Sequence, residues 1–277
     1  MRSVWIMAGV TFREAARRKI LWTALIAGAL LLAIFAIALR VQVHEFQSRA
    51  MSPFVRYQVE SGMLMIGLYT CDLLAVVLTI LTSLDTLAGE ISSGTIAAIA
   101  TKPMARWQIL GGKFLGFAGM SAAYVCLTFG GAVAVAYAAT GVLPVHPARG
   151  VLLIVFECLE ALSVTLLLGT RFSSLTSGVL ALGLQGVAFM GGWLEQVSGF
   201  SQSADIVTLG VASSLIMPGE SLWRRAAYEM QTPLAGSLSF SPFANVSIPS
   251  GTALVYAAVY LTVVIAAAVW HFGRRDL

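Results

Sequence analysis

Three carboxylates interrupt segments of the chain that are otherwise apolar: Asp72, Glu157 and Glu160. A charged side chain at the centre of a bilayer costs about 2.5–3.5 kcal/mol on insertion scales, so such residues call for a role. Glu157 and Glu160 are three apart, which places them on one face of a helix. The three acids predict a polar patch along a substrate path, or a proton relay. The alternative is that each is protonated or hydrogen-bonded within a helix bundle and fixes its packing.

The chain lacks the residue spacings of familiar catalytic and metal sites. Gly112-Lys113 resembles the end of a phosphate-binding loop, but Trp107 replaces the required Gly and Phe114 the required Ser or Thr. We therefore expect no ATP binding through this loop. The sequence has no His-Glu-x-x-His or Gly-x-Ser-x-Gly motif, which disfavours an intramembrane enzyme. We also expect no metal site, because no Cys–His or Met–Met cluster has ligand spacing and three histidines lie far apart: His44, His146 and His271.

The composition indicates an integral membrane protein. The 277 residues are 58% hydrophobic and 11% charged, whereas a soluble domain has roughly 45–50% apolar and about 25% charged residues. Too little polar surface remains to coat a water-soluble globule, which excludes an ordinary cytosolic enzyme and a disordered chain. The 17 Lys and Arg residues are not gathered in one patch, so the net charge of +4 does not indicate a nucleic-acid partner. The expected location is the cell (inner) membrane.

Six apolar segments are long enough to cross a bilayer as helices, since about 20 residues span its core. The expected fold is therefore all-α, a single membrane domain over residues 1–277. The first segment is too long for the apolar region of a signal peptide, and we expect it to remain as a span. The predicted spans are 20–39, 63–88, 114–139, 151–169, 175–193 and 252–270.

The basic residues predict the orientation of the six spans. An even number of crossings places both termini on one side of the membrane. With that side cytoplasmic, eleven of the 17 Lys and Arg residues fall in inner segments, as the positive-inside rule requires.

The segment before the first span, residues 2–19, has the pattern of a helix that lies in the membrane interface. Its apolar residues recur at helical spacing and form a stripe along one face, and its arginines lie off this stripe. An extension of the first span into the cytoplasm is the alternative. The residues of this expected elbow helix include Trp5, Phe12, Arg13, Arg17 and Arg18.

Two loops carry further patterns. In the loop 89–113, Gly89 and Gly94 allow turns, and Thr101-Lys102-Pro103 predicts a break between two short helices. This loop is either well placed to contact a soluble partner or an ordinary polar turn. In the outer loop 194–251, an apolar stripe after Pro218-Gly219 predicts a short helix. That helix is expected at the outer membrane interface, or alternatively as a cap over the bundle.

The inner loop resembles a known family. Gly89-Glu90, Ser93-Gly94-Thr95, Lys102-Pro103, Arg106-Trp107, Ile109-Leu110 and Gly112-Lys113 are similar, in this order, to a run in ABC-2 type exporter permeases. The nearest branch is known as the multicopper-enzyme-maturation permeases. Pro218–Arg224 and the N-terminal segment are also similar to this branch, so the resemblance covers nearly the whole chain.

This resemblance implies a half-transporter without catalytic activity or a bound cofactor. Its expected partners are membrane lipids, a second permease chain in a homo- or heterodimer, and two separate ATPase subunits that bind ATP and Mg. The loop 89–113 would form a coupling helix seated in the ATPase, and the elbow a second contact. Carried over to this sequence, the contact or shaping residues are Glu90, Gly94, Thr95, Lys102, Pro103, Arg106 and Lys113. A rival function is a proton-coupled secondary transporter that uses Asp72, Glu157 and Glu160.

Close helix packing is also expected from glycines such as Gly112-x-x-x-Gly116. From sequence alone these glycines fit packing within one chain or an interface between two permease chains.

Overall fold

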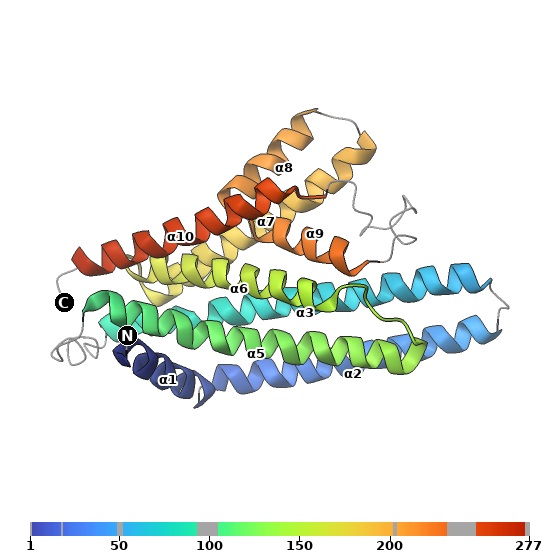
Figure 1. The fold of residues 1–277 in the computed structure, drawn as a ribbon, viewed down its shortest axis with the longest axis horizontal. Helices are drawn as coiled ribbons and strands as arrows, with labels where there is room; N and C mark the ends of the chain where they lie inside the picture. Colours follow the sequence, from blue (N-terminus) through green and yellow to red (C-terminus); the bar gives the residue numbers. More distant parts are fainter. Residues whose placement is uncertain are drawn as a thin grey trace.

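A computed structural model describes residues 2–17, 19–48, 52–92, 105–201, 204–231 and 248–274. Within these ranges the chain is helical and contains no strand, which confirms the all-α prediction (Figure 1). The helices are α1 (Arg2–Arg17), α2 (Lys19–Ser48), α3 (Pro53–Ser92), α5 (Arg106–Thr140), α6 (Pro147–Gly169), α7 (Ser174–Ser201), α8 (Ala204–Ile216), α9 (Gly219–Met230) and α10 (Gly251–Arg274).

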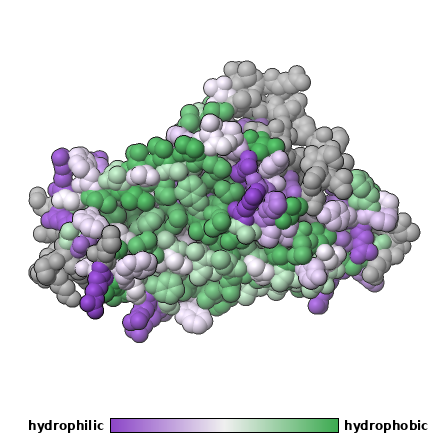
Figure 2. All heavy atoms as spheres, viewed as in Figure 1, coloured by the Kyte–Doolittle hydropathy of each residue, from purple (hydrophilic) through white to green (hydrophobic). Residues whose placement is uncertain are grey.

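The described part of the chain contains six helices long and apolar enough to cross a membrane, as predicted. They are Lys19–Phe46, Pro53–Leu84, Arg106–Thr140, Pro147–Gly169, Ser174–Glu195 and Gly251–Arg274. Apolar side chains cover the middle of the face shown in Figure 2, and hydrophilic ones gather mainly at its two ends. The second span begins at Pro53 rather than at 63, because polar residues continue the helix beyond the apolar run. Arg56 and Glu60 form an ion pair of 2.8 Å there, a spacing that supports a helix.

At one end of the bundle, α1 packs against the first turns of α5. Gly112 and Gly116 permit this approach: a Cβ at Gly116 would lie 2.8 Å from the carbonyl oxygen of Ala8. The glycine pair therefore serves packing within this chain. The buried residues of α1 are Val4, Ala8, Thr11 and Ala15. Of the predicted stripe, Ala8 and Ala15 are buried, whereas Trp5 and Phe12 are exposed.

The last turns of α10 lie at this same end (Figure 1). A guanidinium nitrogen of Arg106 on α5 donates hydrogen bonds to the carbonyl oxygens of Phe272, at 3.3 Å, and Gly273, at 3.1 Å. The final carbonyl groups of a helix lack partners within the helix, so Arg106 caps α10. We call this part of the bundle, formed by α1, the first turns of α5 and the last turns of α10, the α1 end.

Much of the expected outer loop 194–251 is helical within the described residues. α7 runs on to Ser201, and α8 packs back along it, with Ser213 against Gly191 and Gly210 against Glu195. α9 then returns along α6. This helix begins after Pro218, as predicted, but its position at an exposed interface is wrong. Its apolar stripe is buried against the bundle, as the alternative of a packed cap required: Leu222, Trp223, Ala226, Ala227 and Met230.

The turn between α8 and α9 reaches deep into the bundle. Gly219 at this turn lies beside Glu157 of α6 and Gln185 of α7. Both neighbours are near the middle of their membrane spans. The opposite end of α9 lies at the α5–α6 turn, where the Val145 N–H donates to the Met230 carbonyl oxygen at 3.1 Å. The two short helices therefore form a hairpin that enters the bundle and returns.

Candidate functional site

Three carboxylates from three helices meet at one partly open cavity of about 240 Å³. Asp72 comes from α3, Glu157 from α6 and Glu220 from α9, and their exposed fractions are 4%, 1% and 5%. We call this cavity the carboxylate chamber. Its lining residues are Tyr69, Asp72, Leu73, Val76, Val77, Glu157, Leu182, Gln185, Gly186, Phe189 and Glu220.

Two glycines allow α9 to bring Glu220 into the chamber. A Cβ on Gly192 of α7 would clash with the side chain of Glu220. A Cβ on Gly219 would lie 3.2 Å from Oε1 of Glu157. Glu220 also stands in the first turn of α9, where the helix dipole favours a negative charge. The close backbone approach at these two glycines and the position of Glu220 at the start of α9 together bring this third carboxylate to the chamber.

The chamber holds more hydrogen-bond acceptors than donors. Nε2 of Gln185 donates to Oε1 of Glu157 at 3.1 Å. Three further acceptor atoms have no hydrogen-bond partner within the described residues: Oδ1 of Asp72, Oε2 of Glu157 and Oε1 of Gln185. Glu157 also interacts electrostatically with Asp72 and Glu220. Burying several like charges without partners is costly, so this arrangement suits the uptake of protons or of a cation.

Aromatic side chains form part of the chamber wall. The rings of Tyr69 and Phe189 stack with centroids 6.1 Å apart and an angle of 12° between their planes. Trp223 of α9 packs behind Tyr69 at 4.8 Å. Nε1 of Trp193 donates to the Tyr69 hydroxyl at 3.4 Å. These contacts hold the Tyr69 and Phe189 rings in fixed positions beside the acids.

Only one of the two glutamates of α6 lines the chamber. Glu157 does so, whereas Glu160 does not, although it is fully buried. The charge of Glu160 acts on Glu157 and also on Tyr260 of α10. Sequence reasoning missed Glu220 and Gln185. The Pro-Gly start of α9 marked a helix, but nothing in the sequence indicated that this helix turns inward.

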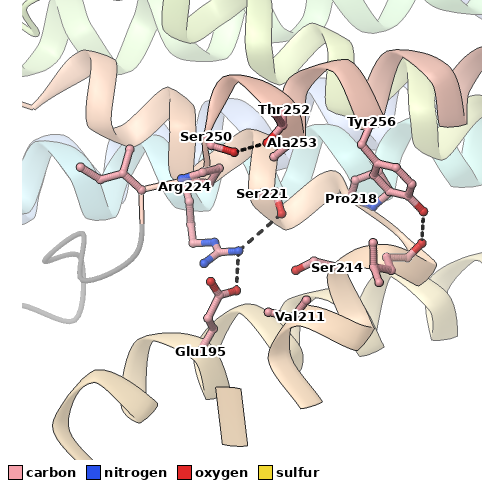
Figure 3. A pocket seen from close by; sticks show the side chains of 13 residues that line it. Glu195, Val211, Ser214, Pro218, Ser221, Arg224, Ser250, Thr252, Ala253 and Tyr256 are labelled. Atoms are coloured by element: carbon pink, nitrogen blue, oxygen red, sulfur yellow. Dashed lines mark hydrogen bonds and ion pairs between the residues drawn. The ribbon is translucent and has the colours of Figure 1, made fainter. Parts of the chain in front are cut away.

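A second cavity, of about 470 Å³, lies on another side of α9, between α7, α8 and α10. Figure 3 shows Arg224 directed at Glu195, with Ser221 beside it. The Arg224 guanidinium is 3% exposed and forms an ion pair of 2.8 Å with Glu195. Arg224 follows Glu220 by one helical turn, so α9 presents an acid to one cavity and a base to the other.

A partly buried acid lies at the far end of α9. Glu229 accepts hydrogen bonds from Arg225 at 2.7 Å and from Arg149 of α6 at 3.2 Å. Partial burial raises the pKa of Glu229, but the hydrogen bonds and charges of the two arginines outweigh burial. The net effect is a Glu229 pKa below its ordinary value.

The residues carried over from the family resemblance fall into three groups. Arg106 caps α10, and Lys113 is 1% exposed, so its ammonium group is not on a surface that a soluble partner would touch. Arg13 and Arg17 are exposed on α1, and Glu90 lies in the last turn of α3. The remaining predicted contact residues lie outside the described residues: Arg18, Gly94, Thr95, Lys102 and Pro103.

The chain matches the model of a known family. Residues 15–185 match the family model described as ABC-2 family transporter protein. The match runs from the last turn of α1 to the middle of α7, and therefore includes Asp72, Glu157 and Gln185 but not Glu220. No protein with a curated description matches the chain.

Proposed function

The chain belongs to the ABC-2 family of transporter proteins, and from this premise we propose that it is the permease subunit of an exporter driven by separate ATPase subunits. The family and the six apolar helices make it a multi-pass membrane permease of an ATP-binding-cassette transporter. The proposal adds the direction of transport, a cytoplasmic location for the α1 end, and pairing with a second permease chain. ATP and Mg would bind to the partner ATPases.

The observation that carries this proposal is the construction of the α1 end. α1 packs on the first turns of α5, and Arg106 ties α10 to those same turns. α3 ends and α5 begins at this end of the bundle (Figure 1). A partner that pushes on the first turn of α5 would therefore displace α1, α5 and α10 together, which is what coupling to an ATPase requires. Exposed Arg13, Arg17 and Trp107 give such a partner a basic and aromatic surface.

The carboxylate chamber is the proposed substrate contact. It lies near mid-height of the spans that contain Asp72, Glu157 and Gln185. Its Glu220 belongs to a hairpin that is inserted between spans rather than crossing the membrane. Movement of α5 and α6 at the α1 end would change the space around this hairpin, because α6 packs against both α5 and α9.

The chamber also supports a second candidate function, a proton-coupled secondary transporter that needs no ATPase. Buried membrane carboxylates are common in proton relays. The two functions differ in their energy source, so the partner of the chain distinguishes them.

The test is purification of the tagged chain in mild detergent, followed by identification of the proteins that accompany it. We expect an ATP-binding-cassette ATPase in fixed ratio to the chain. Charge reversal by Arg13→Glu and Arg17→Glu should reduce its yield, whereas Arg40→Glu, at an exposed site on α2 away from the α1 end, should not. A folded chain that carries no ATPase and transports only with a proton gradient would overturn the proposal.

A further inference from the structure

We propose that the carboxylate chamber binds the positively charged group of an organic ammonium compound, which makes small lipophilic amines the substrate class of this permease. This inference rests on the proposed function, in which the chamber lies on the substrate path. It is argued below from charge, wall chemistry and size.

The charge of the chamber favours a cationic occupant. Its described lining contains Asp72, Glu157 and Glu220 and no basic side chain. A buried base outside the lining, Arg224, interacts electrostatically with Glu220. Its guanidinium, however, lies in the neighbouring cavity, where it forms an ion pair with Glu195. Asp72 and Glu157 thus lack a positive partner among the described residues, and a bound cation would supply one.

The unpartnered hydrogen-bond acceptors of the chamber also favour a cationic ligand. Gln185 lines the chamber and is more than nine-tenths buried. Its Oε1 has no hydrogen-bond partner in the described chain. Its amide nitrogen already donates to Glu157, so the free oxygen is fixed in orientation. Together with Oδ1 of Asp72 it offers acceptors to a ligand that brings donors. A protonated amine does so, whereas an anion does not.

The aromatic wall selects an organic cation. Tyr69 and Phe189 both line the chamber and stack on each other. Aromatic faces attract ammonium groups, and cages of such rings recognise quaternary ammonium ligands. Within the described residues, no group of three or more acidic, His or Cys side chains has the arrangement of a metal site. The chamber therefore suits an ammonium group carried on an apolar body better than a bare metal ion.

The size of the chamber limits the ligand. A cavity of about 150 Å³ in another protein holds benzene. The chamber's volume of about 240 Å³ leaves room for one aromatic ring and a substituted ammonium group. Gly186 lies at the exposed side of this cavity, and a Cβ there would meet no atom within 4 Å.

The test measures binding of radiolabelled N,N-dimethylbenzylamine, which is protonated at pH 7 and carries an N–H donor, to the transporter complex, purified through the tagged chain and reconstituted in nanodiscs. The competitor is its neutral isostere, in which carbon replaces nitrogen. Two pairs of variants separate the chamber from its surroundings. Glu157→Gln removes a chamber charge, and Glu160→Gln removes a buried charge on the same helix outside the chamber. Gly186→Leu fills the chamber, and Gly183→Leu adds the same side chain at an open site on α7 outside the chamber lining.

We expect saturable binding that the neutral isostere does not displace. Glu157→Gln should weaken binding at least about tenfold, because a buried charge partner is lost. Gly186→Leu should abolish it, and the two control variants should bind like the unmodified complex. Absence of saturable binding, equal competition by the neutral isostere, or equal binding by all four variants would overturn the inference. If Glu157→Gln does not fold, the comparison of Gly186→Leu with Gly183→Leu still tests the inference.

The same preparation separates this inference from the proposed function. A complex that contains its ATPase but does not bind the cation overturns the substrate class alone. A chain that binds the cation but brings no ATPase supports the chamber assignment and contradicts the energy source.

Discussion

Gln185 of α7 donates a 3.1 Å hydrogen bond to Glu157 of α6, near the middle of two membrane spans. Each side chain keeps one oxygen atom without a partner in the described chain. The bond therefore orients the two groups toward the chamber without neutralising them. A bundle that needed these residues only for packing would use up their hydrogen-bonding capacity, whereas this pair leaves part of it available to a ligand.

Replacing only one member of this pair should destabilise the protein. Gln185→Leu leaves Glu157 buried without its donor, at a cost of about 1–3 kcal/mol. The double variant Gln185→Leu with Glu157→Leu should recover much of that loss, because both polar groups are then gone. Thermal unfolding in detergent measures both effects. Equal loss from the single and double variants would contradict a direct interaction.

Arg224 should be far more important for stability than the exposed Arg149. Arg224 is 3% exposed in its ion pair with Glu195, while Arg149 is 67% exposed in its pair with Glu229. Arg224→Met strands a largely buried acid and should cost about 3–5 kcal/mol. Arg149→Met should cost about 0–1 kcal/mol. Unfolding curves of the two variants test the difference, and similar losses would refute it.

The α1–α5 contact should tolerate no added methyl group. Gly116→Ala places a carbon against the Ala8 backbone and should cost about 1–3 kcal/mol. Gly111→Ala, at an open position of the same helix, should be neutral or stabilise by about 0.4–1 kcal/mol. Limited trypsin cleavage at Arg13 and Arg17 reports release of α1. Faster cleavage is expected in the Gly116 variant alone.

Glu229 should add an acid-sensitive contribution to stability. Its pKa is lower in the folded protein than its ordinary value of 4.5, so the unfolded chain binds its proton more readily. The contribution is complete above about pH 5 and disappears as the pH falls below 4.5 toward the folded-state pKa. The melting temperature of Glu229→Gln should therefore lie below that of the unmodified chain at pH 7, and the gap should narrow toward pH 4. A gap that widens in acid would contradict the assigned direction.

The sequence predicted the spans well because a bilayer enforces a length and a composition that can be read directly. The sequence also indicated Asp72 and Glu157 as candidate site residues, because an ionisable side chain is rare within an apolar membrane segment. It could not predict their partners. Glu220 and Arg224 lie in a stretch of mixed polarity, and burial of α9 depends on glycines 192 and 219, whose neighbours come from distant parts of the chain.

Two further details depend on contacts that the sequence alone does not reveal. Glu157 and Glu160 share a helix face by spacing. The turn of the helix over three residues nevertheless places Glu157 at the chamber and leaves Glu160 nearer the side of α6 that faces α10. Trp5 and Phe12 were predicted to lie on the apolar stripe that faces the membrane interface, and both are exposed on α1. The glycines of α5 instead receive Met7, Thr11 and the backbone of Ala8.

The central claim is that an ATPase engages the α1 end of this permease. Photocrosslinking in cells tests it directly, with benzoylphenylalanine placed at Trp107 on α5 or at Leu143 beyond the far end of α5. The two sites are 52% and 51% exposed, so they differ in position and not in accessibility. The account predicts a crosslinked ATP-binding-cassette ATPase from position 107 and none from 143. An ATPase adduct from 143, or none from 107 in a folded chain, would contradict it.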